Sequence, residues 1–204
     1  IAAGLNFVAT GLPWWTYDAG GFFRPGNQYH DKDYIERMIR WIQAGTFLPL
    51  MRVHGYMSNT EPWHYGADAQ RIVTDYIRLR YRLFPYIYSE AAKISREGST
   101  LMRPLVFDFP ADVEALEQDN EYMFGPSLLI NPVTEKGVKQ WKTYLPDYAY
   151  GWYDFWTGEK IAGNQWVDVS VDIEKIPVFV KAGTILPMGE DKQSVSDKKD
   201  GAIT

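Results

Sequence analysis

Two short apolar runs early in the chain each stop at glycine, and they constrain the fold more than any other feature of the sequence. The first run, residues 12–18, is followed by Gly20, and the second, residues 48–54, is followed by Gly55. Apolar runs bounded by proline and glycine are typical of core strands in a parallel sheet that is covered on both faces. Such strands require a crossover connection between them, usually a helix.

The segment between the two runs repeats its apolar residues at helical spacing. The residues on this predicted helix face are Ile35, Met38, Ile39 and Ile42. Asp31 or Asp33 can cap the start of the helix, and Gly45 can end it. In a strand–helix–strand unit the two strands run in parallel. We therefore expect Asp18 and His54, at the ends of the two runs, to face one cleft.

A further, longer helix is predicted over residues 68–97, with a kink at Pro85. Three arginines, Arg78, Arg80 and Arg82, lie on it. We expect them on a solvated face, where they reach neighbouring carboxylates rather than bind phosphate.

The pattern then changes from helical spacing to short alternating or β-rich runs separated by turns, as in a β-sandwich. These runs cover residues 103–107, 127–133, 141–145, 152–155, 166–171, 177–180 and 184–187. The predicted organisation is an α/β unit over residues 1–100 and an all-β sandwich over residues 101–190. A charged tail, or the start of a further segment, follows over residues 191–204.

The composition narrows the class of protein. The net charge of -5 and the lack of a basic stripe argue against nucleic acid as a partner. The sequence has no cysteine, which excludes disulfides and thiolate chemistry. No apolar run reaches membrane-spanning length, so no membrane segment is expected. Aromatic residues reach 16%, with 8 Trp, and favour stacking surfaces or an aromatic core. The compartment stays open, with a bacterial periplasmic or cytoplasmic protein as the working guess.

Asp18 is the best candidate for a functional side chain. A carboxylate at the end of a buried strand is costly unless it is hydrogen-bonded or meets a ligand there. The aromatic residues beside it favour a sugar ring or another flat apolar ligand. The alternative is that Asp18 only caps the following turn. The three histidines, His30, His54 and His64, lack the spacing of a metal-ligand set, so neither a metal nor another cofactor is expected.

A set of nine short motifs, taken in order, resembles the signatures of glycoside hydrolase family 31. They are DAGGF at 18–22, RWIQAG at 40–45, PLMRVHG at 49–55, EPW at 61–63, LRYRLFPYIY at 79–88, RPL at 103–105, YMFG at 122–125, DFWTG at 154–158 and IPVFVKAG at 176–183. Each motif alone is weak evidence, but the ordered set is specific. The resemblance covers nearly everything from Leu5 to Pro187.

The resemblance implies a fold and a chemistry. Members of the family have a (β/α)8 TIM barrel followed by β-sandwich domains, so this chain would hold the last barrel strands and helices plus the proximal C-terminal sandwich. They hydrolyse terminal α-linked sugars with retention of configuration, using two aspartates. Both aspartates would lie upstream of Ile1, so no catalytic residue is expected in this chain and it should not turn over substrate alone. The implied partners are an oligosaccharide and the N-terminal part of the same barrel.

The resemblance also implies roles for five residues. Asp18 and His54 would hydrogen-bond hydroxyls of the non-reducing-end sugar. Phe22 would line the pocket wall, and Arg52 would orient carboxylates by charge-assisted bonds. Trp15, like its neighbour Trp14, matches an aromatic position of the family.

The sequence leaves two substrates possible for such an enzyme, and it leaves one other class of protein as an alternative. The form LPWWTYD at 12–18 is more similar to bacterial α-xylosidases acting on xyloglucan fragments than to maltose-cleaving α-glucosidases. The competing class is a non-catalytic carbohydrate-binding or scaffold protein whose β-sandwich stacks sugars. Its platform would consist of Trp141, Trp152, Trp156 and Trp166. The alternation of the runs favours core and interdomain packing for these residues.

Overall fold

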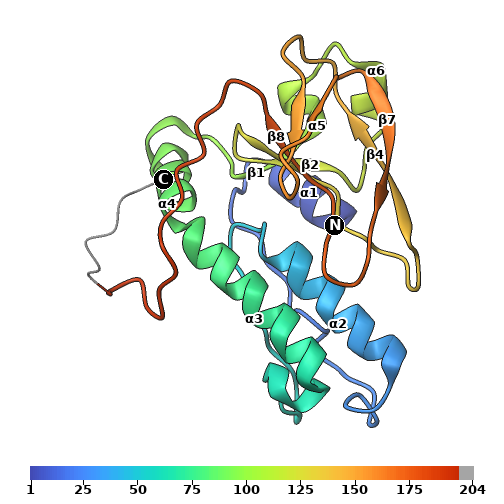
Figure 1. Cartoon of the computed structure of the whole chain (residues 1–204). Helices are drawn as coiled ribbons and strands as arrows, with labels where there is room; N and C mark the ends of the chain where they lie inside the picture. Colours follow the sequence, from blue (N-terminus) through green and yellow to red (C-terminus); the bar gives the residue numbers. More distant parts are fainter. Residues whose placement is uncertain (198–204) are drawn as a thin grey trace.

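Helices dominate the first half of the chain and strands the second half in the computed structural model, which describes residues 1–197 (Figure 1). We call residues 1–98 the helical half and residues 99–189 the strand half. The helical half contains α1 (Ala2–Ala9), α2 (Lys32–Gly45), the 3-10 helix η1 (Pro62–Tyr65), α3 (Ala67–Arg82) and α4 (Phe84–Glu97). The strand half contains β1 (Met102–Pro104), α5 (Leu105–Asp108), α6 (Val113–Leu116), β2 (Tyr122–Phe124), β3 (Leu128–Ile130), β4 (Gln140–Leu145), β5 (Trp152–Asp154), β6 (Lys160–Ile161), β7 (Gln165–Ser170) and β8 (Val178–Lys181).

Helix α2 has the start and the end that the sequence predicts. Asp31 caps it, because its carboxylate accepts hydrogen bonds from the backbone N–H groups of Asp33 and Tyr34 at 3.0 and 3.2 Å. A cap of this kind stabilises a helix by about 1 kcal/mol. The apolar face, which includes Met38 and Ile42, is buried, and α2 lies beside α3 (Figure 1).

The single long helix predicted over residues 68–97 is instead two helices, α3 and α4, which meet at Leu83. Pro85 lies in the first turn of α4. It has no backbone N–H for the carbonyl of Tyr81, and its ring clashes with that turn, so the helix breaks rather than bends. Leu83 itself is fully buried at the junction.

The strand half has two antiparallel sheets. Six strands are arranged in the order β1-β2-β3-β8-β5-β6, and β4 pairs with β7 in a separate ribbon. Alternate residues of β2 belong to two cores. Tyr122 and Phe124 pack with residues of the helical half, whereas Met123 packs with Tyr144 and other residues of the strand half. The six-stranded sheet is therefore buried on both faces at its centre.

Four details of the predicted strands are wrong or incomplete, and one of them is that the predicted runs do not include β6 at Lys160–Ile161. Strand β2 was not predicted, because a three-residue strand buried on both faces shows no alternation. The predicted strand over residues 103–107 ends at Pro104, and the chain continues as α5. Arg103 of β1 forms an ion pair at 2.8 Å with Asp108, the last residue of α5. Residues 184–187 form no strand, because the chain leaves the sheet there, and Gly189 donates to the carbonyl of Arg82.

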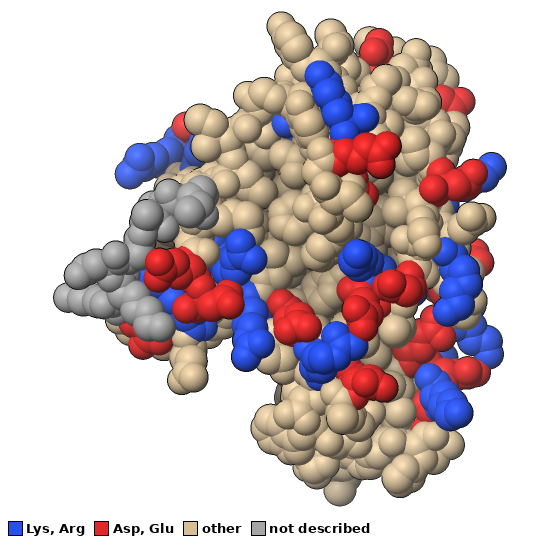
Figure 2. Space-filling model, in the orientation of Figure 1, with Lys and Arg blue, Asp and Glu red and all other residues tan. Residues whose placement is uncertain are grey.

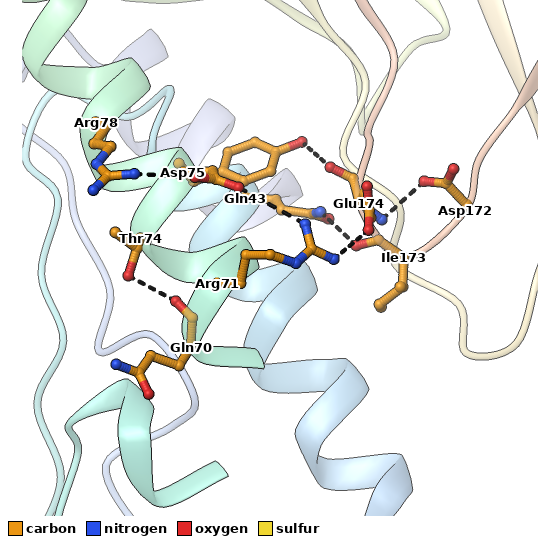
Figure 3. Close-up of polar contacts among 10 residues, drawn as sticks. Gln43, Gln70, Arg71, Thr74, Asp75, Arg78, Asp172, Ile173 and Glu174 are labelled. Atoms are coloured by element: carbon orange, nitrogen blue, oxygen red, sulfur yellow. Dashed lines mark hydrogen bonds and ion pairs between the residues drawn. The ribbon is translucent and has the colours of Figure 1, made fainter. Parts of the chain in front are cut away.

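Polar contacts join the two halves along α2 and α3, and Figure 3 shows them at the loop before β8. The Gln43 side chain donates to the backbone carbonyl of Ile173 at 2.8 Å, and the Arg71 guanidinium pairs with the Glu174 carboxylate. Figure 2 shows that basic and acidic side chains interleave on this face of the molecule. In the described part of the chain, no helix is both long enough and apolar enough to cross a membrane.

A second connection between the halves is buried. The hydroxyl of Tyr122 in β2 donates to the backbone carbonyl of Phe47 at 2.9 Å, and the ring of Phe47 meets that of Phe124 edge to face. A further, partly buried contact between the halves is the bond from the Arg40 guanidinium to the carbonyl of Lys175 at 2.8 Å. The strand half therefore packs directly against the segment that follows α2.

Candidate functional site

The two apolar runs of the sequence lie side by side as two extended segments, which we call arm one (residues 12–23) and arm two (residues 46–57). A single parallel bridge joins Ala19 to Val53. Backbone hydrogen bonds join the arms at three places: from Leu50 to Trp15 at 3.3 Å, from Ala19 to Arg52 at 3.1 Å, and from Tyr56 to Phe22 at 2.8 Å. The predicted parallel arrangement is present.

The prediction that both runs are regular strands is wrong for the described residues. Among the described residues each arm has only the other as a strand neighbour, and three bonds do not make a ladder. One side of the arms is open, since Trp14 is 44% exposed and Leu50 is 48% exposed.

Asp18, Arg52 and His54 lie on one face of the two arms. The bridge between Ala19 and Val53 sets Asp18 beside Arg52 and Gly20 beside His54. Since side chains alternate along extended backbone, residues 18, 52 and 54 share a face. The Arg52 Nε lies 2.6 Å from the Asp18 Oδ1, with the two side chains 51% and 22% exposed. A charge-assisted bond of this length fixes the direction of the carboxylate.

An aromatic wall, formed by Phe22, Phe23 and Tyr56, stands beside His54. The Phe22 ring lies 5.4 Å from the imidazole, 4.9 Å from Phe23 and 5.8 Å from Tyr56, measured between centroids. All three aromatic side chains are exposed. Within residues 1–197 the His54 ring nitrogens have no hydrogen-bond partner. The edge therefore presents a carboxylate, an imidazole and aromatic faces to the surface.

Trp15 lies on a different part of arm one. Its ring packs on Phe7 of α1 at 5.1 Å, and a Cβ added at Gly4 would lie 2.4 Å from its Nε1. Trp15 therefore fills the junction between α1 and arm one, whereas the ring nearest His54 is that of Phe22. A separate cavity of about 440 Å³ lies between α2 and residues 132–136 and touches Tyr17, but neither Asp18 nor His54.

Two arginines that the sequence did not predict at the site donate hydrogen bonds to the backbone of the arms. Arg24 donates to backbone carbonyls of both arms and to the hydroxyl of Tyr65. Tyr34 donates to the carbonyl of Gly20 at 2.9 Å, and burial raises the pKa of Tyr34 to about 12, so this hydroxyl keeps its proton. A loop arginine followed by proline and glycine gives no signal of such a role in the sequence.

Arg80 is the second of these residues, and its expected place on a solvated face is wrong. It donates to the carbonyls of Thr46, Leu48 and Pro49 at 2.6, 2.8 and 3.0 Å. Burial lowers the pKa of Arg80 to about 10, so the guanidinium is still charged at neutral pH. Arg80 thus fixes the start of arm two. The exposed neighbour Arg78 does reach a carboxylate, as expected.

The four tryptophans of the strand half do not form an exposed platform. Trp152 is fully buried and donates to the carbonyl of Pro146 at 3.0 Å. Trp141 and Trp156 are partly buried, and each donates its indole N–H within the chain. Trp166, at 46% exposed, packs against Tyr144. Within residues 1–197 no three or more His, Asp or Glu side chains gather as a metal-binding group.

Comparisons with known proteins place both halves in one family. Residues 1–90 match the model of the glycosyl hydrolases family 31 TIM-barrel domain, and residues 98–186 match that of the glycosyl hydrolase family 31 C-terminal domain. The chain is 49% identical to an α-xylosidase of Saccharolobus solfataricus over 92% of its own length and 25% of that protein. It is 33% identical to α-glucosidase 2 of Bacillus thermoamyloliquefaciens over 93% of its length and 23% of that protein.

A solved structure agrees with these matches. The crystal structure of a GH31 α-xylosidase from a soil metagenome, complexed with xylose, superposes with a TM-score of 0.84 at 37% identity, over 90% of this chain and 30% of that one. The predicted fold class, the end of a TIM barrel followed by a β-sandwich, is confirmed. The chain spans about a quarter of the length of the two curated relatives. It belongs to glycoside hydrolase family 31.

Proposed function

We propose that the chain is the C-terminal part of a retaining, exo-acting α-glycosidase, and that Asp18 and His54 bind the non-reducing-end sugar of an oligosaccharide. The observation that carries the proposal is the shared face of the two arms, where Asp18, Arg52 and His54 lie together beside Phe22. A carboxylate and an imidazole bind sugar hydroxyls. An exposed aromatic ring packs on the apolar face of a pyranose.

Each residue has a defined part in this proposal. Asp18 accepts hydrogen bonds from hydroxyl groups, and Arg52 holds its carboxylate in one direction. His54 binds a neighbouring hydroxyl, and Phe22 forms the wall. In retaining glycosidases, hydroxyl bonds that strengthen as the ring distorts contribute several kcal/mol to the stability of the oxocarbenium-like transition state. Trp15 supports arm one from behind through its contact with α1.

The bond-breaking steps belong to other residues in this proposal. A retaining mechanism needs two carboxyl groups about 5–5.5 Å apart across the scissile bond. Asp18 is the only acidic residue in either arm, so it has no partner there for such a pair. The nucleophile and the general acid/base are therefore proposed to lie on barrel strands N-terminal to Ile1, and the 204-residue chain alone would bind sugar without hydrolysing it.

An α-xyloside is the proposed substrate, with an α-glucoside as the second choice. The chain is 49% identical to the α-xylosidase from Saccharolobus solfataricus, against 33% for α-glucosidase 2. The structural relative from a soil metagenome was crystallised with xylose. Xylose lacks the hydroxymethyl group at C5, so the groups that close the space around C5 would decide between the two sugars.

The test is made in the longer polypeptide that carries the upstream aspartates. Asp18→Asn and His54→Gln should each lower kcat/KM for p-nitrophenyl α-xyloside by about 10- to 100-fold, the size expected for a hydrogen bond to a charged or strongly polar group. Asp68→Asn, at an exposed site in the first turn of α3, is the matched control and should leave kcat/KM unchanged.

Two results would contradict the proposal. The first is an unchanged kcat/KM in both the Asp18→Asn and the His54→Gln variants. The second is hydrolysis of an α-xyloside or α-glucoside at an enzyme-like rate by the 204-residue chain alone, because the residues that break the bond would then lie within it.

A further inference from the structure

Arg24 joins the ends of the two arms. It follows Phe23 in the chain, and one edge of its guanidinium donates to three backbone carbonyls. Nε donates to Gly21 at 3.1 Å, and Nη2 donates to Ala19 at 3.1 Å and to His54 at 3.3 Å. Two of these carbonyls belong to the turn after Asp18, and the third belongs to His54 itself. One rigid group therefore bonds to the backbone next to both proposed sugar-binding residues.

The other edge of the guanidinium is bound to the loop before α3. Nη1 donates to the hydroxyl of Tyr65 at 2.7 Å and to the carbonyl of Asn59 at 3.5 Å. The Tyr65 hydroxyl in turn donates to Asn59 at 3.2 Å. Tyr65 is buried and lies at the end of η1. Arg24 is thus held from behind by a buried residue while it holds both arms in front.

The backbone around Arg24 leaves little room for any other arrangement. A Cβ added at Gly55 would lie 2.8 Å from the Arg24 Nε and 3.1 Å from its Cζ. A Cβ added at Gly20 would lie 3.3 Å from its Nη2. Gly20 and Gly55, which follow the two apolar runs, therefore also make the space that the guanidinium occupies. No salt bridge to Arg24 occurs among residues 1–197, so its interactions are with carbonyl and hydroxyl oxygens.

We propose that Arg24 is a positioning residue that sets the distance between the Asp18 carboxylate and the His54 imidazole. This inference rests on the sugar-binding role proposed above for those two side chains. Two of its bonds hold the turn of arm one and one crosses to the carbonyl of His54 in arm two, so Arg24 links the arms at a place where they share no ladder. Lysine cannot do the same, because one ammonium group does not reproduce the planar fork of five donors.

The experiment measures kcat and KM for p-nitrophenyl α-xyloside in the longer polypeptide. Arg24→Gln and Arg24→Lys should both lower kcat/KM by roughly 10- to 100-fold, because small displacements of a positioned group have effects of this size. Tyr65→Phe, which removes one acceptor of Arg24 and keeps the ring, should lower it by about 2- to 5-fold. Arg96→Gln, at an exposed position in the last turn of α4, is the matched control.

A double variant separates positioning from general loss of stability. If Arg24 acts through His54, the Arg24→Gln/His54→Gln protein should lose little more activity than the worse single variant, since coupled residues are not additive. Multiplied single effects would overturn the inference, as would full activity in Arg24→Gln. If Arg24→Gln does not fold, an unchanged kcat/KM in Tyr65→Phe overturns it instead. In each case, reduced activity in Asp18→Asn and His54→Gln would leave the proposed function standing.

Discussion

The centre of the strand half and the two arms are both made of extended backbone, but they are held in different ways. Strand β3 bonds on both edges, to β2 and to β8, and its three residues are fully buried. The arms share three backbone hydrogen bonds and one bridge, and part of their surface is exposed. In the arms, the guanidinium groups of Arg24 and Arg80 donate to backbone carbonyls that are not paired in a strand ladder.

This difference teaches how extended segments without a strand ladder can be held in place. Backbone carbonyls need partners wherever water is excluded. A neighbouring strand satisfies them but also covers the edge that it pairs with. A guanidinium group can also donate to backbone carbonyls, but it contacts the arms only near their ends. In the described part of the chain, the face that Asp18, Arg52 and His54 share is therefore not covered by a strand.

The largest effect should come from removing an aromatic side chain from the strand half. Trp152→Ala should lower the free energy of unfolding by about 3–5 kcal/mol, because Trp152 is fully buried and its indole bonds to Pro146. Trp14→Ala, in arm one, should cost about 1 kcal/mol or less, because half of that side chain is already in water. Urea unfolding of both variants tests the comparison. Equal losses would mean that arm one is packed as tightly as the sheet.

A smaller change in the free energy of unfolding should follow when the pH is raised. Burial raises the pKa of Glu121 to about 8, partly offset by the backbone N–H of Tyr144, and the Oε2 has no partner among the described residues. Between the ordinary pKa of 4.5 and about 8, the folded chain holds a proton that the unfolded chain releases. Stability should therefore be highest below this window and fall by about 2–4 kcal/mol from pH 5 to pH 8.

The check on this prediction is a pair of glutamine variants. Glu121→Gln cannot ionise, so its unfolding free energy should vary less over the same pH range. Glu117→Gln, at an exposed position, should keep the slope of the unchanged chain. An identical slope in the Glu121→Gln protein would show that this carboxyl is not the group responsible.

A still smaller effect than the change with pH should follow from replacing Arg80. Arg80→Gln leaves carbonyls of Thr46, Leu48 and Pro49 without donors, at a cost of about 1–3 kcal/mol. The loss should be local, and the amide of Leu50 should exchange with solvent faster, whereas amides of β3 should change little. Arg78→Gln, on the exposed side of α3, is the control. Uniformly faster exchange in both halves would remove the distinction between arms and sheet.

The main elements could be predicted from the sequence because their signals are local. Asp31 and Gly45 mark the ends of α2 within a few residues of the helix itself. The parallel order of the arms follows from that helix, and with it the nearness of Asp18 and His54. Strand β2 was missed because two cores cover it, and burial on both faces removes the alternation that identifies a strand.

The support of the site could not be predicted in the same way. Arg24 meets backbone carbonyls from three separate segments, and carbonyl groups leave no mark in the sequence. Arg80 sits between two other arginines on one helix, and only the packing of α3 against the start of arm two distinguishes it. Such contacts depend on the tertiary arrangement and not on residue type.

The hydrogen bond from Tyr122 to Phe47 bears on whether the helical half and the strand half can be exchanged separately between related genes. Phe47 lies at the start of arm two, and its carbonyl is satisfied from β2, 75 positions further along the chain. A gene fusion that joined the first 98 residues to a sandwich without a tyrosine in the place of Tyr122 would leave the carbonyl of Phe47 buried without this donor. Recombination is therefore expected to transmit the barrel end and the sandwich as one block.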